Sequence, residues 1–314
     1  MRLSRRPALV TGLTSAAILS LALTGCGGGA NASGTSAAAG SGDSVTCPNG
    51  KIRFGVEPFE DPSKLEPAYR TIADALGKEL NCKVEVTVVD NYAAEVLAMK
   101  NGQMELGQFG PLGYVFAKQE ANAKALVSFG TSDGKLSSYT GGIWVPKDSP
   151  IQSIADLKGK SLALSEPGST SGDALPRYAI RKEGMQDSDL KIQYAGGHPE
   201  ALLALKNGKV DAAEINSQQL ATSTAEGQFD ASQFRQIWTS EPIPNDPITV
   251  AGNAPQEFQD AVKKALANLP AEAVAEAAKF LDVEPAGQLI EVTENDYQPL
   301  ADLAKTMGLT SKDA

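Results

Sequence analysis

A six-residue internal repeat is the sequence feature that most constrains the fold. Residues 97–102 read LAMKNG, residues 203–208 read LALKNG, and 106 positions separate the two copies. Each copy closes an apolar helical pattern, and a short strand pattern follows it, at 104–106 and at 210–212. Lysine, asparagine and glycine are common at helix ends, so one match could be chance. The matching strands favour two lobes of similar construction.

Strand and helix patterns alternate along both lobes. Leu65, Tyr69, Ile72, Leu76 and Leu80 fall on one face of a helix, and β-branched runs flank it. Such alternation predicts parallel strands covered by helices. From residue 254 onward the chain is expected to be mostly helical and to pack back onto the first lobe. The expected strands are 51–56, 84–88, 105–108, 125–129, 143–145, 161–164, 190–193, 209–214 and 236–239, and the expected helices are 65–80, 92–100, 112–119, 172–183, 198–207 and 218–226.

The chain is expected to cross between the lobes twice, near 139–143 and in the proline-rich stretch 241–250. Two crossings make a hinge. The predicted first lobe is 45–140 plus 249–314, and the predicted second lobe is 141–248. Together they form a two-lobed α/β fold, in which ligands bind at the carboxyl ends of the parallel strands.

The first 25 residues have the pattern of an export signal. Three arginines precede an apolar run, and Leu-Thr-Gly-Cys ends it at Cys26. These four residues resemble a bacterial lipobox, which predicts removal of 1–25 and a lipid on Cys26. The alternative is an ordinary secreted protein with an incidental cysteine. Residues 26–44 are rich in glycine, alanine and serine and are expected to form a flexible tether. We therefore expect an exported protein anchored to the outer face of the cell membrane, or a periplasmic one.

Charge, histidine and cysteine content exclude several classes of protein. The net charge is −10, and it becomes −13 when the signal leaves with its three arginines and no acidic residue. This acidity argues against nucleic-acid binding. One histidine, His198, excludes multi-histidine metal centres, and neither a metal nor a cofactor is expected. Of the three cysteines, Cys47 and Cys82 remain after Cys26 and are expected to form a disulfide, with two buried thiols as the alternative.

The strongest site signal is the stretch Pro-Gly-Ser-Thr-Ser-Gly at 167–172, between a strand and a helix. The hydroxyls of Ser169, Thr170 and Ser171, with the free N–H groups of a helix N-terminus, suit an anion. A simple helix cap is the alternative. The Gly-Lys-Ser/Thr of a Walker motif is missing.

Four more residues are candidates for the same site. Tyr92 and His198 differ by the repeat offset, so they open equivalent helices. Tyr139 and Asp246 lie in the two crossings. The phenols and the imidazole would donate hydrogen bonds, and the carboxylate would accept a proton that a ligand brings. The alternatives are packing for the tyrosines, a cap or surface position for the histidine, and a turn for the aspartate.

Four short motifs carry a resemblance to a known family. They are DNYAA at 90–94, STSG at 169–172, GGH at 196–198 and IPNDP at 243–247, with IADLKGK at 154–160 among them. The chain resembles the phosphonate- and phosphite-binding proteins of ABC importers over most of residues 51–270. The resemblance implies a type II periplasmic-binding-protein fold with the ligand clamped between the lobes. It also implies that the Ser-Thr-Ser hydroxyls hold the phosphonate oxygens, that Tyr92, Tyr139 and His198 donate further, and that Asp246 accepts from a protonated ligand oxygen.

One position departs from the family. Members that take aminoethylphosphonate carry a carboxylate for the amine, where this chain has Gln218. A neutral amide cannot neutralise an ammonium group. Phosphite, methylphosphonate or another small phosphorus oxyanion is therefore favoured, although Glu214 is close enough in sequence to reopen the question.

These observations predict a solute-binding protein that works as a monomer, is not an enzyme, and delivers its ligand to a membrane permease. Two alternatives stay open. One is a binder of phosphate, sulfate or an organic phosphate. The other is a hydrolase using Ser169, His198 and an aspartate, against which stands the missing Gly-x-Ser-x-Gly elbow.

Overall fold

The computed structural model of the chain describes residues 47–313, so Cys26, the signal and the predicted tether lie outside the described residues. The helices are α1 Pro62–Leu80, α2 Tyr92–Lys100, α3 Pro111–Ala121, α4 Leu175–Lys182, α5 His198–Lys206, α6 Ser217–Ala225, α7 Gln256–Ala267, α8 Ala271–Phe280 and α9 Gln298–Met307. The strands are β1 Ile52–Val56, β2 Val84–Val88, β3 Leu106–Gln108, β4 Lys124–Thr131, β5 Ser138–Tyr139, β6 Gly142–Pro146, β7 Ser161–Leu164, β8 Lys191–Tyr194, β9 Ala212–Glu214, β10 Phe234–Thr239, β11 Ile243–Pro244, β12 Pro247–Val250 and β13 Ala286–Glu291.

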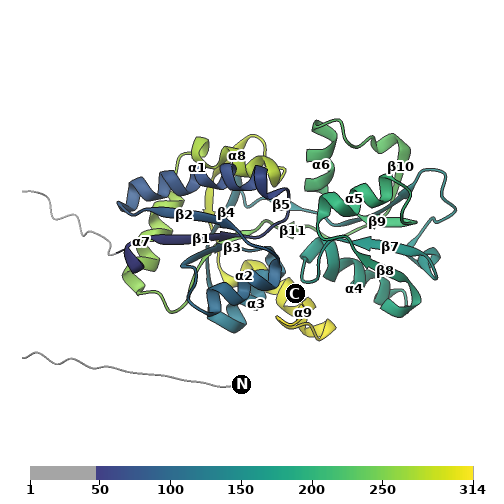
Figure 1. The fold of residues 1–314 in the computed structure, drawn as a ribbon, viewed down its shortest axis with the longest axis horizontal. Helices are drawn as coiled ribbons and strands as arrows, with labels where there is room; N and C mark the ends of the chain where they lie inside the picture. The colour runs from purple at the N-terminus through teal and green to yellow at the C-terminus, as the bar shows by residue number, and fades with distance from the viewer. Residues whose placement is uncertain (1–46, 314) are drawn as a thin grey trace, which may run out of the picture. The chain divides into compact units, whose positions relative to one another are not determined.

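Two mixed sheets organise the described chain, on the left and right of Figure 1. The first has the strand order β13-β4-β12-β3-β1-β2, and the second has the order β10-β6-β9-β7-β8. We call each sheet with its helices a lobe. Neighbours β1, β2 and β3 run parallel, as do β7, β8 and β9. The predicted α/β character is confirmed, and the functional edge of each sheet is the one where these parallel strands end.

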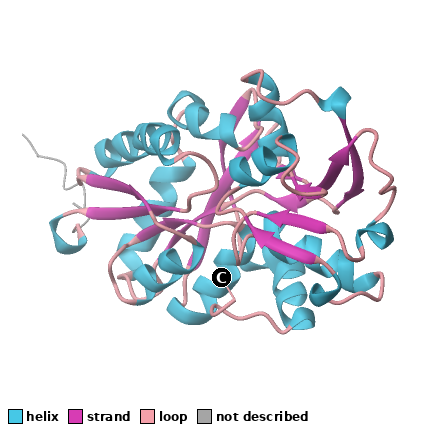
Figure 2. Cartoon of the chain, turned by 45° about the vertical axis from the view of Figure 1, so that its right-hand side comes forward, coloured by secondary structure: helices cyan, strands magenta, loops and turns pink. Residues whose placement is uncertain are grey.

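Helices cover both faces of the first sheet (Figure 2). On one face α1, α7 and α8 bury apolar side chains against the strands. Tyr69 of α1 lies there between Phe54 and Phe129, with edge-on ring contacts at 6.1 and 6.4 Å. On the other face α2, α3 and α9 form a second apolar cluster. Because both faces are buried, the strands can be apolar throughout.

The repeat predicted from the sequence is present in the structure. Helices α2 and α5 each have nine residues and begin 106 positions apart, at Tyr92 and His198. Strands β3 and β9 follow them at the same offset. Each helix therefore starts at the carboxyl edge of its sheet, which brings the first residue of both helices to the junction of the lobes.

Two strands of the first sheet were not anticipated from the sequence. Strand β12 lies antiparallel between β3 and β4, and β13 pairs antiparallel with the outer edge of β4. The expectation of a mostly helical chain after residue 254 is therefore wrong at 286–291, although α7, α8 and α9 are helices. Strand β12 begins at Pro247, two residues before the predicted return to the first lobe. Tertiary pairing, which local propensity does not encode, creates both strands.

The two predicted crossings lie side by side. Strands β5 and β11 pair antiparallel, with Ile243 opposite Tyr139. This two-stranded ladder joins the lobes and places Tyr139 beside the junction. The domain boundaries within it stay a prediction.

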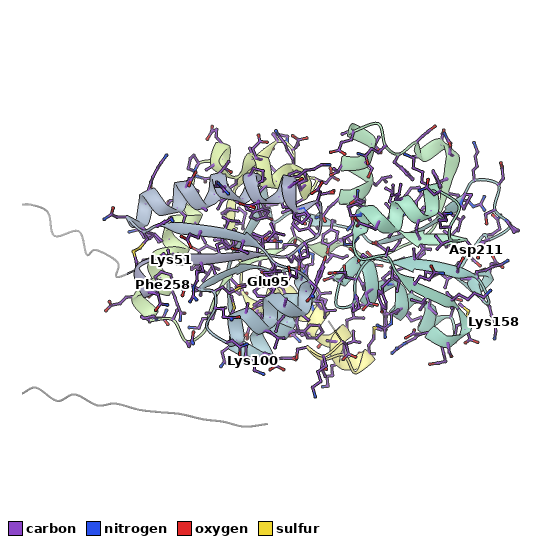
Figure 3. The ribbon with its side chains drawn as sticks, viewed as in Figure 1. Lys51, Glu95, Lys100, Lys158, Asp211 and Phe258 are labelled. Carbon is purple, nitrogen blue, oxygen red and sulfur yellow. A yellow bond between two sulfur atoms is a disulfide. The ribbon has the colours of Figure 1, made fainter. Side chains whose placement is uncertain are left out.

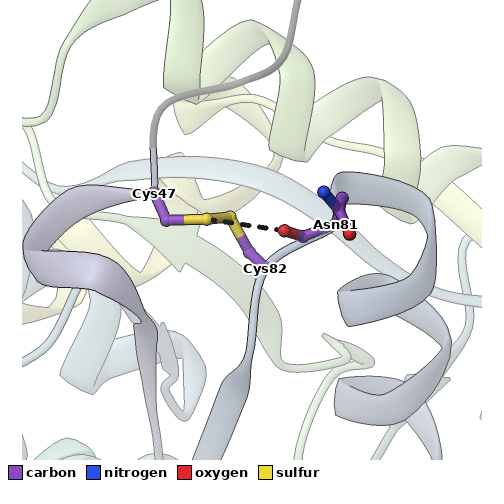
Figure 4. Close-up of a disulfide and its surroundings, with 3 residues drawn as sticks. All are labelled: Cys47, Asn81 and Cys82. Carbon is purple, nitrogen blue, oxygen red and sulfur yellow. Dashed lines mark hydrogen bonds between the residues drawn. A yellow bond between two sulfur atoms is a disulfide. The ribbon is translucent and has the colours of Figure 1, made fainter.

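A disulfide joins Cys47 to Cys82, with 5.9 Å between the Cα atoms (Figure 4). The two residues precede the parallel neighbours β1 and β2, which explains why they meet. The bond lies at the amino ends of these strands, away from the functional edge. None of the helices within residues 47–313 is long and apolar enough to cross a membrane.

Candidate functional site

A small cavity of about 10 Å³, lined by buried residues, lies between the carboxyl edges of the two sheets. This is the room that about one water molecule needs, so a larger ligand requires the walls to move apart. Seven of the eight candidates that the sequence proposed for the ligand line the cavity, and Ser171 is the exception. The lining residues are Glu57, Phe59, Tyr92, Gly110, Tyr139, Ser169, Thr170, His198, Asn216, Gln218 and Asp246.

The Ser-Thr-Ser stretch forms the start of a helical turn between β7 and α4. Ser169 caps a π-helical turn, Thr170–Ala174, and its side chain accepts from the N–H of Gly172 at 3.2 Å. The Thr170 hydroxyl accepts from the N–H of Leu112 at 2.9 Å, and that of Ser171 accepts from the Asn216 amide at 3.1 Å. Each hydroxyl oxygen thus accepts from the protein. Its hydrogen remains to donate to an anion.

His198 is held by the carboxylate of Glu214. The Nδ1 atom lies 2.5 Å from Glu214 Oε1, and both side chains are buried. Burial lowers the pKa of His198, but the charge and hydrogen bond of Glu214 outweigh it, and the pKa is raised above its ordinary value. The Nε2 atom lies 3.3 Å from the Ser169 hydroxyl oxygen. When the ring is protonated, a positive donor stands beside the Ser-Thr-Ser stretch.

Two phenols complete the donor side. Burial is the main cause that raises the pKa of Tyr92 and of Tyr139 well above the ordinary value. Both phenols therefore keep their O–H. Tyr92 hydrogen-bonds with Ser169, and Tyr139 with Ser171 and Thr170. One phenol comes from the first lobe and the other from the hinge, so both meet the Ser-Thr-Ser stretch across the junction.

The first lobe contributes Asp246, ahead of β12. Its Oδ2 accepts from Gln108 Nε2 at 2.6 Å. Burial raises the pKa of Asp246 to about 7, while His198 and the Gln108 hydrogen bond oppose the shift. A carboxyl group that titrates near neutrality can accept a hydrogen bond from a protonated ligand oxygen.

Two buried glutamates were missed by the sequence analysis. Glu57 follows β1 and lines the cavity, and Glu95 lies on α2 behind it. Figure 3 shows Glu95 near the centre of the view and Lys100, at the other end of α2, at the lower edge. Burial raises the pKa of both glutamates well above the ordinary value, with Asp246 as a further cause. Glu57 could have been found by its position, because it is the first residue after a parallel strand at the functional edge.

Neither Gln218 nor Glu214 is placed to pair with the amine of a ligand such as aminoethylphosphonate. The Gln218 amide donates to Asn245 Oδ1 at 2.6 Å, so the side chain is tied to the hinge segment. Glu214 is paired with His198 and is not among the residues that line the cavity. Neither residue offers a free carboxylate to an ammonium group.

Uncharged donors make up most of the polar lining of the cavity. None of its lining residues, all in the described part of the chain, is a lysine or an arginine. Among residues 47–313, no group of three histidine, cysteine, aspartate or glutamate side chains is arranged to hold a metal ion. Hydroxyls, phenols and one imidazolium face the two carboxyls of Glu57 and Asp246. This arrangement suits a small oxyanion.

Several polar contacts connect the lobes. Among them are the Leu112–Thr170 hydrogen bond and a hydrogen bond from the Gln218 amide to the Leu281 carbonyl at 3.4 Å. Another is an ion pair of 2.7 Å between Lys64 of α1 and Glu226 at the end of α6. It lies in an open cleft of about 730 Å³ whose charged lining residues are mostly acidic. The charged residues of that cleft are Glu60, Asp61, Lys64, Asp90, Glu166, Glu200 and Glu226.

Gly172→Ala is expected to disrupt the Ser-Thr-Ser stretch. A methyl group there would lie 1.8 Å from Ser165 Oγ and 2.8 Å from His198 Cε1. We expect a loss of about 2–3 kcal/mol in the free energy of unfolding, the cost of an overpacked core site, measured by urea denaturation. Gly113→Ala is the matched control, because its nearest neighbour would be 3.6 Å away. Equal stability of the two variants would contradict the tight packing described here.

Comparisons with known proteins agree with this geometry. The sequence pattern of the family described as "ABC transporter, phosphonate, periplasmic substrate-binding protein" matches residues 54–297. The phosphonates-binding periplasmic protein of Escherichia coli is 28% identical over 216 residues, which cover 67% of this chain and 64% of that protein. The phosphate-import protein PhnD of Mycolicibacterium smegmatis is 26% identical over 278 residues, covering 82% of this chain and 86% of that protein.

Solved structures show the same fold. PhnD1 of Prochlorococcus marinus in complex with methylphosphonate has a TM-score of 0.72 at 18% identity, and the match covers 83% of this chain and 99% of that one. A binding-protein component of an ABC phosphonate transporter from Pseudomonas aeruginosa has a TM-score of 0.71 at 21% identity, covering 82% and 86%. These likenesses confirm the two-lobed periplasmic-binding-protein fold.

Proposed function

The chain belongs to the family of periplasmic phosphonate substrate-binding proteins of ABC transporters, and from that premise we propose that it is a lipid-anchored component that clamps a small phosphorus oxyanion between its lobes. Phosphite, methylphosphonate and other small phosphonates are the ligands favoured. The partner is a membrane permease. The lipid anchor on Cys26 rests on the sequence pattern, and the family itself is exported.

The observation that carries the proposal is the hydrogen bonding of the three hydroxyl groups. Because Ser169, Thr170 and Ser171 each accept an N–H from the protein, their oxygens are held in place and their hydrogens can still donate. Ser169 and Thr170, with Tyr92, Tyr139 and His198, put five donors in the lining of the cavity, and Ser171 is the sixth donor, next to them in the chain. Each charge-assisted bond to an oxyanion contributes about 1.5–3 kcal/mol. A compact ligand with three or more oxygens uses this set best.

Phosphate is the first alternative ligand. The Mycolicibacterium smegmatis relative is named for phosphate import, and Asp246 can accept from a protonated phosphate oxygen as readily as from a phosphonate. A thermal-shift panel separates the ligands. At 100 times the Kd a ligand adds about 2.7 kcal/mol of stability, which raises the Tm of a protein of this size by about 5 °C.

We expect that shift with phosphite or methylphosphonate and a smaller one with phosphate, sulfate or aminoethylphosphonate at the same concentration. A shift with sulfate or an organic phosphate alone would contradict the proposed ligand class. A larger shift with aminoethylphosphonate would contradict the prediction that Gln218, as a neutral amide, disfavours a ligand with an amine.

A hydrolase is the second candidate, because one arrangement favours it. Ser169 Oγ, His198 and Glu214 lie in the order of a serine, histidine and acid triad, at 3.3 and 2.5 Å. However, a general base must be neutral, and the pKa of His198 is raised, in the direction that favours the protonated ring. Incubation with a methylphosphonate ester distinguishes the two functions. Stoichiometric stabilisation without product supports the binder, and steady release of alcohol supports the enzyme.

A further inference from the structure

Glu57 stands out because it is a carboxyl group in the wall of an anion site. Its side chain is 2% exposed and lines the cavity together with Ser169, Thr170 and His198 of the other lobe. It follows directly after β1, so the rigid sheet fixes its position.

The Glu57 carboxyl group packs against the backbone at the start of α3, and one of its oxygens has no hydrogen-bond partner among residues 47–313. The backbone N–H of Gly110, at the start of α3, donates to it. A methyl group at Gly110 would lie 2.6 Å from Glu57 Oε1, which shows how closely the carboxyl packs on that backbone. Glu57 Oε2 is buried and has no hydrogen-bond partner. An oxygen so placed is costly unless a ligand meets it.

The surroundings of Glu57 are acidic. Asp246 approaches it from the segment before β12, Glu95 from α2 and Glu166 from the loop after β7. The imidazolium of His198 lies across the cavity, paired with Glu214. Uncharged phenols of Tyr69, Tyr92 and Tyr139 face the same group. Several buried carboxyl groups at such close quarters cannot all be ionised.

An oxyanion in the cavity adds a further negative charge to this wall. An ionised Glu57 would repel it, whereas a protonated carboxyl group can donate its O–H to it, as buried acids do in some oxyanion holes. The orphaned Oε2 is the atom that would carry the hydrogen. Asp246 remains the acceptor, since it already accepts from Gln108.

We propose that Glu57 is a ligand-binding residue that enters the closed site as a neutral carboxylic acid and donates its O–H to an oxygen of the bound oxyanion. The proposal rests on the proposed function, because it assigns a seventh donor to the same ligand. It also explains how a carboxyl group can line an anion site. Burial and the neighbouring carboxyl groups raise the pKa of Glu57, in the direction that keeps the proton on it.

The test is calorimetric titration of methylphosphonate into the wild type, Glu57→Gln, Glu57→Leu and Glu79→Gln at several pH values from 6 to 9. The Gln amide also donates, so Glu57→Gln is expected to bind within about threefold of wild type at pH 6–7. Glu57→Leu lacks the donor and is expected to bind at least tenfold more weakly. Glu79→Gln makes the same substitution at an exposed position of α1 and is expected to bind like wild type.

The pH series isolates the proton on Glu57. At each pH, free methylphosphonate has the same protonation state whichever variant it is added to. The ratio of wild-type to Glu57→Gln affinity therefore depends on the protein alone. Above the pKa of Glu57 the wild type is expected to lose about tenfold in affinity per pH unit relative to Glu57→Gln.

Three results would overturn the assignment. Unchanged binding by Glu57→Leu would show that Glu57 does not meet the ligand. A loss of tenfold or more in Glu57→Gln at pH 6–7 would show that Glu57 is an ionised acceptor. A pH-independent ratio in which Glu57→Gln binds more weakly would exclude a neutral acid. If the wild type binds none of the phosphorus oxyanions, the proposed function fails and the role of Glu57 fails with it; tight wild-type binding with an indifferent Glu57→Leu refutes the Glu57 role alone.

Discussion

Replacing His198 with alanine is expected to lower the affinity for phosphite about 100-fold and to destabilise the unliganded protein. The affinity falls because the site loses its one positive donor, a charge-assisted bond of about 1.5–3 kcal/mol. Stability falls because Glu214, which is fully buried, loses its partner. Breaking a buried ion pair from one side costs about 3–5 kcal/mol. Calorimetric titration and urea denaturation measure the two effects separately.

The double variant His198→Ala/Glu214→Gln separates stability from binding. Removing the stranded charge is expected to recover most of the lost stability and none of the lost affinity. The pH dependence gives a second check. Because the pKa of His198 is raised in the folded protein, its contribution is complete below the ordinary value of about 6.5 and is lost as the pH rises through the raised pKa. If His198→Ala bound phosphite as tightly as wild type, His198 would have no role in ligand binding.

Removing the Cys47–Cys82 disulfide is expected to lower the free energy of unfolding by about 3–4 kcal/mol. The bond closes a loop with a sequence separation of 35 residues, and the entropy of that loop in the unfolded chain gives this value. The change is made as Cys47→Ser/Cys82→Ser and measured by urea denaturation.

Ligand affinity is expected to stay unchanged in the double serine variant, because the bond lies at the amino ends of β1 and β2 and the site lies at their carboxyl ends. Reduced wild-type protein serves as the control that leaves the sequence intact. A loss below about 1 kcal/mol in both would contradict the stabilising role of the bond.

Local sequence patterns are enough to predict the helices and the central strands. The strand 84–88 and the helix 92–100 have the bounds that the sequence predicts, since β-branched runs and a helix-ending Asn-Gly mark them locally. Strands β5 and β11, of two residues each, carry no periodicity of their own. Strand β13 contains two small residues and no clear alternation, and it exists because the edge of β4 is free to pair. Such pairings are properties of the assembled sheet.

The donor side of the site was predictable and its acidic wall was not. Glycines and hydroxyls between a strand and a helix have a local signature, and the repeat aligned Tyr92 with His198. Glu57 stands in a Val-Glu-Pro sequence that is ordinary for a surface turn. Only the approach of Gly110 and Asp246, which are distant in sequence, buries it. The pairing of Glu214 with His198 likewise joins a helix start to a strand end 16 residues later.

The acidic cleft beside the lobe junction has a kinetic consequence. A protein usually gathers its charged ligand by steering it with a field of opposite sign. Here an anion that enters through the cleft would pass Glu60, Asp90 and Glu166, and the one lysine that lines this cleft is already paired with Glu226. Encounter is therefore slowed by repulsion at long range, and salt, which screens that repulsion, speeds it. The affinity of such a site comes from a slow dissociation rate rather than a fast association rate.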